Sequence, residues 1–258
     1  PWAIYIVFAL GIGYAHYNRG LPLAPRSLLY PLVGDRIFGP IGHAVDIAAT
    51  VGTLFGVATS LGLGAMQINA GLEALAGISK GTGTQVTIIL VITAVATVSV
   101  VSGLHKGIQW LSTGNLLLAL LLLLFVLFAG PTVFVLDLFV SSLGEYLQQL
   151  PRLSFWLDLR KESDWQAQWT LFYWSWWISW SPFVGVFTAR ISRGRTLREF
   201  VCTVLVAPAL LTFLWLAVFG GTALEGLRGG EEAVARAVEK DPALSLHALL
   251  SELPFQTV

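Results

Sequence analysis

The sequence predicts an all-α fold, a polytopic transmembrane helical bundle. Only 12% of its 258 residues are charged and the mean hydropathy is +0.74, which argues against a soluble domain. Five stretches contain no Asp, Glu, Lys or Arg, and each exceeds the roughly 20 residues that a helix needs to cross a bilayer. These stretches are 47–72, 81–105, 107–136, 165–189 and 200–224. A further uncharged segment, 5–17, is typical of the end of a sixth span whose start is missing.

These patterns predict six helices in one transmembrane domain (1–258) that is incomplete at both ends. The expected helices are at about 1–17, 46–72, 84–104, 114–136, 168–190 and 200–223.

The distribution of charge predicts the orientation of these helices. If they alternate in direction, segments 18–45, 105–113 and 191–199 share one side and, with Arg190, hold eight Lys and Arg residues. The other side holds seven, but six of them lie in the long loops 137–167 and 224–258, which also carry eleven acidic residues. Long loops count for less in the positive-inside rule. The basic run that begins at Arg190 is therefore expected to face the cytoplasm, and the two long loops are expected to be extracytoplasmic.

The two long loops are not uniformly polar. Segment 143–166 mixes apolar and polar residues at helical spacing, which favours an amphipathic helix on the outer membrane surface; a merely structured loop is the alternative. Segment 226–242 is interpreted as a solvated loop, helical in part. The single cysteine, Cys202, excludes a disulfide framework, and the four histidines are scattered. We therefore expect no catalytic residues, no metal site and no enzyme activity.

The stretch WTLFYWSWWISWSPF, 169–183, concentrates five tryptophans without a charge. On a helix, most rings of this region fall within an arc of roughly 100°; they are Trp169, Tyr173, Trp176, Trp177, Trp180 and Phe187. An interfacial aromatic belt would explain Trp169 but not the rings nearer the middle of the span. Trp176, Trp177 and Trp180 lie roughly 15–21 Å from the basic end, in a hydrocarbon core of about 30 Å. Tight helix packing is the other alternative, although membrane helix interfaces favour small residues.

Such a stripe suits a cage for a quaternary ammonium ion, which has no proton to donate. Indole faces attract such a cation by roughly 0.5–2 kcal/mol per ring when desolvated. Four rings then supply on the order of 6 kcal/mol, an affinity between millimolar and micromolar. Pro182 removes the backbone bond to Ile178 and should free a carbonyl at mid-membrane, as in the interrupted helices of secondary transporters. In the helix 46–72, Thr53, Thr59 and Ser60 either face a cavity or bond back to their own helix.

The segment WTLFYWSWWISWSPFVGVFTARISRGRTLREF, 169–200, resembles the signature region of the betaine/choline/carnitine transporter (BCCT) family. PWAIY at 1–5, SLGLGAMQINAGL at 60–72 and GIQWLSTGN at 107–115 also follow the family's order. The resemblance runs through nearly all of the chain. It implies a twelve-span protein with a partial LeuT-type inverted-repeat fold here, covering about spans four to nine. It also implies a location in the inner (cytoplasmic) membrane and, commonly, a homotrimer.

Carried over by position, the resemblance implies which residues bind substrate and ion. The substrate residues would be Trp2, Tyr5, Ser60, Trp176, Trp177, Trp180 and Phe187, and a coupling-ion site would use Tyr5, Thr53 and Phe183. Val57 stands where the family has a second hydroxyl in that ion site. Sodium-independent exchangers of the family place an Arg on span seven, where this sequence has no Lys or Arg. Sodium and a proton both remain as the coupling ion, and no other cofactor is expected.

The sequence thus predicts a secondary active transporter that imports glycine betaine, choline or carnitine by alternating access, for osmoprotection. The alternative is a non-transporting osmosensor or receptor that uses the same aromatic cage. The expected partners are a small quaternary ammonium substrate and the lipid bilayer, and no nucleic acid.

Overall fold

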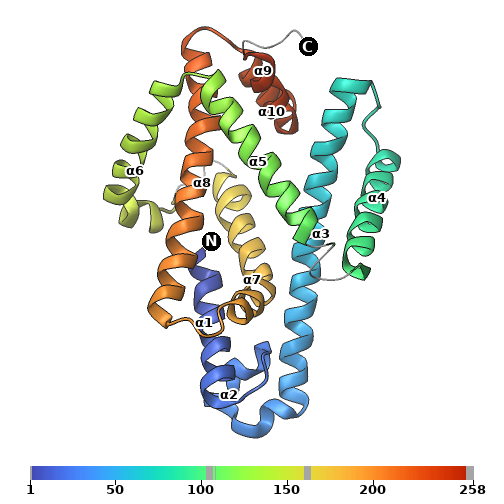
Figure 1. The fold of residues 1–258 in the computed structure, drawn as a ribbon, viewed down its shortest axis with the longest axis vertical. Coiled ribbons are helices and arrows are strands. Elements are labelled where there is room, and N and C mark those ends of the chain that lie inside the picture. Colours follow the sequence, from blue (N-terminus) through green and yellow to red (C-terminus); the bar gives the residue numbers. More distant parts are fainter. Residues whose placement is uncertain (1, 103–106, 108, 160–163, 254–258) are drawn as a thin grey trace. The chain divides into compact units, whose positions relative to one another are not determined.

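The computed structural model describes residues 2–102, 107, 109–159 and 164–253 (Figure 1). Within these ranges every regular element is helical and no strand occurs, which confirms the predicted all-α class. Lys106, the end of the expected helix 84–104 and parts of both long loops (160–163 and 254–258) lie outside the described residues.

The chain folds as two compact units. The first unit comprises Pro1–Ser60 and Arg152–Leu211, and the second comprises Leu61–Pro151 and Thr212–Val258. The long helices α3 and α8 each contribute one part to each unit.

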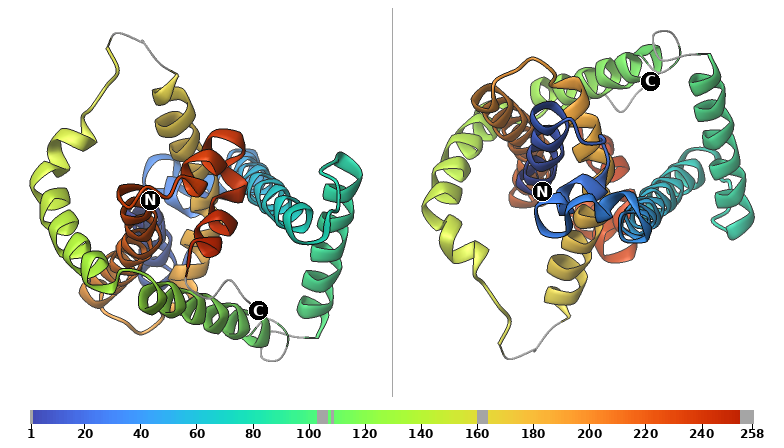
Figure 2. Two further views of the ribbon diagram at one scale, coloured as in Figure 1. Left: turned by 90° about the horizontal axis from the view of Figure 1, so that it is seen from above. Right: turned by 90° about the horizontal axis from the view of Figure 1, so that it is seen from below.

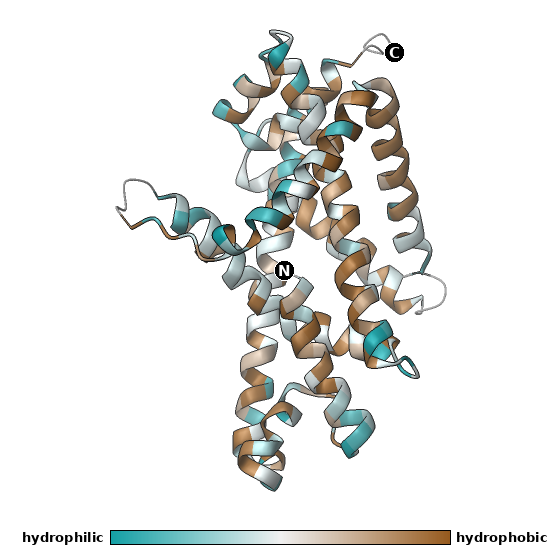
Figure 3. Cartoon of the chain, turned by 90° about the vertical axis from the view of Figure 1, so that its left-hand side faces the viewer, coloured by the Kyte–Doolittle hydropathy of each residue, from teal (hydrophilic) through white to brown (hydrophobic). Residues whose placement is uncertain are grey.

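Four helices in the described ranges are long and apolar enough to cross a membrane. They are α3 (Pro40–Ala76), α4 (Thr82–Val101), α5 (Gln109–Ala129) and α8 (Leu197–Arg228). Figure 3 shows hydrophobic residues along the helices and hydrophilic residues mainly at helix ends and loops. The other two expected spans correspond to α1 (Trp2–Arg19) and α7 (Phe172–Ile191). They are less apolar than the other four, because α7 is rich in Trp and Ser and α1 ends in polar and charged residues.

In the first unit, α1 packs against α7 (Figures 1 and 2). Gly185 allows the close approach, because a Cβ there would lie 2.7 Å from the Phe8 ring and 3.3 Å from the Ala9 nitrogen. The Tyr17 hydroxyl donates to the Ala189 carbonyl at 3.3 Å. Around this contact lies an apolar core made of Ile6, Ala9, Ile12, Ala189 and Phe200. The packing follows the rule that small residues bring membrane helices together.

Short helices connect α1 to α3: η1 (Pro25–Leu29), α2 (Tyr30–Val33) and η2 (Gly34–Phe38). The Arg26 guanidinium pairs with the Asp46 carboxylate at 2.8 Å, and the Arg26 backbone N–H donates to the same carboxylate at 3.0 Å. This pair fixes the connection to the first turns of α3.

The approach to α7 and the start of α8 complete the first unit. A π-helical turn, η4 (Gln166–Leu171), leads directly into α7. The start of α8 is fixed by a reciprocal cap, because the Thr196 N–H donates to the Glu199 carboxylate at 2.9 Å and the Glu199 N–H donates to the Thr196 hydroxyl at 3.2 Å.

The second unit contains α4, α5, most of α6 (Thr132–Ser154), α9 (Ala233–Lys240), η5 (Pro242–Leu244) and α10 (Ser245–Ser251), with the parts of α3 and α8 assigned to it. Its apolar core joins α5, α6, α8, α9 and α10 through Leu123, Val126, Val135, Val218, Val234, Leu249 and Leu253. Helix α9 lies in the segment 226–242, which was interpreted as a solvated loop, helical in part, and α10 follows this segment.

The structure divides the expected helix 114–136. Helix α5 ends at Ala129 and α6 begins at Thr132. Pro131 has no N–H to continue the backbone hydrogen bonds of the helix. The Thr132 hydroxyl donates instead to the Leu127 carbonyl at 2.7 Å. Helix α6 then continues to Ser154, so helical structure covers the first half of the segment 143–166, for which an amphipathic helix was predicted.

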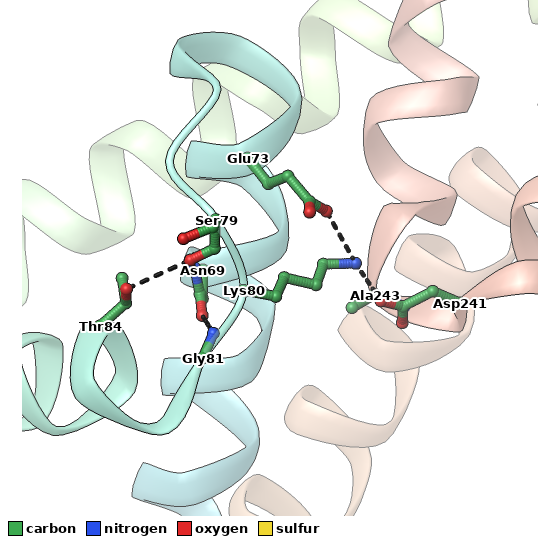
Figure 4. Close-up of polar contacts among 8 residues, drawn as sticks. All are labelled: Asn69, Glu73, Ser79, Lys80, Gly81, Thr84, Asp241 and Ala243. Atoms are coloured by element: carbon green, nitrogen blue, oxygen red, sulfur yellow. Dashed lines mark hydrogen bonds and ion pairs between the residues drawn. The ribbon is translucent and has the colours of Figure 1, made fainter.

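A buried asparagine orders the loop between α3 and α4 (Figure 4). Asn69 is fully buried; its side-chain oxygen accepts from the Gly81 N–H at 3.3 Å, and its NH₂ donates to the Ser79 carbonyl at 3.5 Å. Burial of this amide is tolerated because both its acceptor and its donor have partners.

The same loop carries an ion pair to the start of η5. Lys80 Nζ lies 2.5 Å from Asp241 Oδ2 and 3.2 Å from Glu73 Oε2 (Figure 4). The hydrogen bond from Lys80, with a second from the Ala243 N–H, lowers the pKa of Asp241 below its ordinary value of 3.8. The hydrogen bond to Asp241 is also the main cause that raises the pKa of Lys80 above 10.5. The link therefore ties the end of α3 to the α9–η5 connection over a wide pH range.

Candidate functional site

The tryptophan-rich segment forms a ladder of ring contacts along η4 and α7. Trp165 stacks on Trp169 with ring centroids 6.5 Å apart, and Trp169 stacks on Tyr173 at 5.8 Å. Tyr173 contacts both Trp176 and Trp177, at 5.9 and 5.7 Å. Residues three and four positions apart share one helix face, so the contacts follow the stripe that the sequence spacing indicates.

The rings differ in exposure along the ladder. Trp169 and Trp174 expose about half of their surface, 51% and 53%. Trp176, Trp177 and Trp180 are less exposed than these two and are partly buried. The Trp176 indole nitrogen is shielded from solvent and has no hydrogen-bond partner among the residues that the structure describes. Buried indole N–H groups usually have a partner, so Trp176 offers an unused donor.

Trp180 sits against a glycine of α3. A Cβ on Gly56 would lie 2.9 Å from Cδ1 and 3.0 Å from Nε1 of the indole, closer than ordinary contact. Trp180 also meets Phe183 edge-on at 5.5 Å. The absence of a side chain at position 56 therefore creates the space that this indole fills.

Helix α7 continues through Pro182, and this corrects the expectation of a freed carbonyl. The Ser181 hydroxyl donates to the Ile178 carbonyl at 2.7 Å, the group that an N–H at position 182 would have reached. Ser181 itself is buried, with 5% of its surface exposed. A side chain replaces the lost backbone bond, and the Ile178 carbonyl is not left to line a cavity.

The hydroxyls of α3 bond back to their own helix. Thr53 donates to the Ala49 carbonyl at 2.9 Å, and Ser60 donates to the Gly56 carbonyl at 3.1 Å. Thr59 does the same at 2.9 Å. All three hydroxyls therefore bond back to their own helix, and Thr53 also lines a cavity. Each oxygen keeps lone pairs, so Thr53 and Ser60 can still accept a hydrogen bond or coordinate a cation.

A cavity of about 560 Å³ lies between α3, α7 and the segment 23–25, all in the first unit. Three residues predicted for the site line it: Thr53, Phe183 and Phe187. Its charged lining residues are Asp46 on α3 and Arg190 at the end of α7. Asp46 is not among the residues predicted for the site, although its spacing places it on one helical face with Thr50 and Thr53.

The remaining predicted residues lie outside this lining. Trp2 and Tyr5 meet edge-on at 5.7 Å on α1. In the described part of the chain, no ring contact joins α1 to α7. The lining also omits Ser60, Trp176, Trp177 and Trp180. The structure therefore gathers the ion-site residues Thr53 and Phe183 with Phe187, whereas the indoles lie along the helix that borders the cavity.

Comparison with known proteins identifies the family. The family model described as BCCT, betaine/carnitine/choline family transporter, matches residues 1–258 of this chain. The chain belongs to this family.

Curated members of the BCCT family align with almost all of this chain. The glycine betaine/proline/choline transporter of Vibrio parahaemolyticus is 46% identical over 259 residues, covering 100% of this chain and 46% of that protein. The glycine betaine transporter OpuD of Bacillus subtilis is 48% identical over 237 residues, 91% of this chain and 46% of that protein. The high-affinity choline transport protein of Escherichia coli K12 is 46% identical over 256 residues, 98% of this chain and 38% of that protein. The chain thus spans less than half the length of these relatives.

BCCT membership and the long apolar helices together make the chain part of a multi-pass protein of the cytoplasmic membrane. The relatives are named as transporters and none of those above is named as an enzyme, in agreement with the sequence interpretation. The family resemblance inferred from the tryptophan motif is confirmed.

Proposed function

We propose that the protein is a secondary active transporter that imports a quaternary ammonium compatible solute, such as glycine betaine, choline or carnitine, by alternating access. The observation that carries the proposal is the family match over residues 1–258. Glycine betaine and choline also occur in the names of the relatives.

The indole ladder supplies a physical basis for recognising such a substrate. A quaternary nitrogen cannot donate a hydrogen bond, so it is held by ring faces, each contributing roughly 0.5–2 kcal/mol when desolvated. The unused Trp176 N–H could donate to a carboxylate oxygen or hydroxyl of the same substrate. In this proposal the substrate residues are Trp2, Tyr5, Ser60, Trp176, Trp177, Trp180 and Phe187.

We propose sodium or a proton as the coupling ion. Thr53 and Phe183, two of the three residues predicted for the ion site, line one cavity beside α7. Val57 brings no oxygen to this site, and Tyr5 lies outside the cavity lining. Separate sodium and pH gradients across proteoliposomes would distinguish the two ions. A homotrimer and a role in osmoprotection belong to the same proposal.

The test is uptake of labelled glycine betaine and choline by the full-length protein. Trp177→Ala should raise KM about tenfold, because it removes one desolvated ring from the cage. Trp174→Ala is the matched control, since Trp174 lies off the stripe and is 53% exposed. Its KM should stay within about twofold of wild type.

Three outcomes would contradict the proposal. Wild-type protein that takes up neither solute would remove the transport function. Equal changes of KM in Trp177→Ala and Trp174→Ala would contradict the aromatic cage. Binding without accumulation against a gradient in proteoliposomes would favour the receptor or sensor instead.

A further inference from the structure

The cavity beside α7 contains one charge that has a partner and one that has none. Asp46 is held by Arg26 through the 2.8 Å ion pair and the 3.0 Å backbone bond, so its negative charge is compensated. Arg190 lines the same cavity, is exposed, and forms no ion pair with any residue that the structure describes. The uncompensated charge of the cavity is therefore positive.

Two aromatic rings adjoin this charge. Phe183, Phe187 and Arg190 are spaced at i, i+4 and i+7, which places them on one face of α7. Both phenyl rings are half-exposed, 54% and 53%. Along the helix, Phe187 and Arg190 are separated by about 4.5 Å of axial rise. A ring face and a guanidinium thus lie about one turn apart on the wall of one cavity.

This arrangement matches the two ends of a short zwitterion. A guanidinium forms strong, often bidentate, hydrogen bonds with a carboxylate. A phenyl ring face attracts a methylated nitrogen. In glycine betaine a single methylene separates these groups, so one molecule can reach both Phe187 and Arg190.

We propose that this cavity is a second binding site for zwitterionic substrates, at the end of α7 that the basic residues assign to the cytoplasm. Arg190 binds the carboxylate, and Phe183 with Phe187 holds the quaternary nitrogen. The inference rests on the proposed transport function and extends it to selectivity on the inner side. Choline has no carboxylate, and at this site its cation meets the like charge of Arg190.

The experiment is substrate counterflow with the full-length protein in proteoliposomes, which gives the internal half-saturation concentration. Glycine betaine and choline are compared in wild type, Arg190→Gln and Arg190→Lys. Arg190→Gln should raise the internal half-saturation concentration for betaine relative to that for choline by about tenfold, the loss of one charged hydrogen-bonded contact. Arg190→Lys should recover part of this ratio, because it keeps the charge but not the fork.

Two further variants complete the comparison. Phe187→Ala should raise the half-saturation concentration for both solutes, because it removes a contact with the shared cationic end; Phe187 is also among the substrate residues proposed above, so the second site is tested by the Arg190 variants. Arg193→Gln, in the same basic run but outside the cavity lining, should leave the betaine-to-choline ratio unchanged. If Arg190 contacts only lipid phosphates, Arg190→Gln should change the internal half-saturation concentrations of both solutes equally.

Each outcome decides the matter. A betaine-to-choline ratio that changes in Arg190→Gln and recovers in Arg190→Lys supports the site. An unchanged ratio overturns the site while leaving the proposed transport function intact. Wild-type protein that exchanges neither solute overturns both.

Discussion

The contact between Trp180 and Gly56 gives a sharp prediction for Gly56→Ala. The added Cβ would lie 2.9–3.0 Å from two indole atoms, whereas carbon atoms pack best at about 3.5–4.0 Å. The indole must therefore move by roughly 0.5–1 Å. Overpacking of this kind costs about 1–3 kcal/mol of folding free energy, offset by up to about 1 kcal/mol because Ala is the better helix former.

Gly52 is the matched control, one turn earlier on α3. A Cβ there would lie 3.9 Å from the Ser179 carbonyl oxygen, an ordinary contact, so Gly52→Ala should be neutral or stabilising. We expect Gly56→Ala to unfold at a lower temperature than Gly52→Ala and to have a KM for glycine betaine about three- to tenfold higher. Thermal unfolding and uptake by the full-length protein measure these two quantities. Indistinguishable values for the two variants would refute the view that Gly56 positions Trp180.

Two further predictions concern a hydrogen bond and an ion pair. Ser181→Ala should cost about 1 kcal/mol of unfolding free energy, because it leaves the Ile178 carbonyl without a donor; Ser179→Ala, whose hydrogen bond is exposed, should cost less in the same denaturation assay. The lowered pKa of Asp241 predicts that the Lys80–Asp241 link is fully present above about pH 4 and is lost as pH falls through the lowered pKa. The raised pKa of Lys80 predicts full stabilisation below about pH 10.5 and loss as pH rises beyond it. Hydrogen exchange of the loop 77–81 should be slow between these limits in wild type and faster in Lys80→Gln, and a wild-type rate in that variant would show that the link does not order the loop.

The fold class followed from the sequence because long uncharged runs have few other structures in a bilayer. Boundaries were less predictable where two helices meet without a polar loop. The uncharged run 107–136 contains both α5 and the start of α6, and only Gly130–Pro131 marks the division. Hydropathy alone cannot detect such a break, because it depends on a missing N–H rather than on a polar side chain.

The candidate site was predictable where helical spacing decides which residues share a face. The ring ladder from Trp169 to Trp177 follows directly from the 3.6-residue period. The Arg26–Asp46 pair was not predictable, because it joins residues 20 positions apart through short helices whose arrangement the sequence pattern does not specify. The Ser181 bond was missed for a different reason, since the sequence showed Pro182 but not that the preceding hydroxyl would take the free carbonyl.

The two explanations for the tryptophan stripe apply to different residues. Trp180 fills the space above Gly56, so its role includes the packing of α7 against α3. Trp177 contacts Tyr173 on its own helix, and neither it nor Trp176 has a ring contact with α1 in the described chain. A bulky ring is costly to bury without a partner for its N–H, and the Trp176 N–H has none among the described residues. Packing against α3 therefore accounts for Trp180, whereas Trp176 packs on Phe172 and Tyr173 of its own helix and keeps an unused donor, which supports the proposed ligand contact at Trp176.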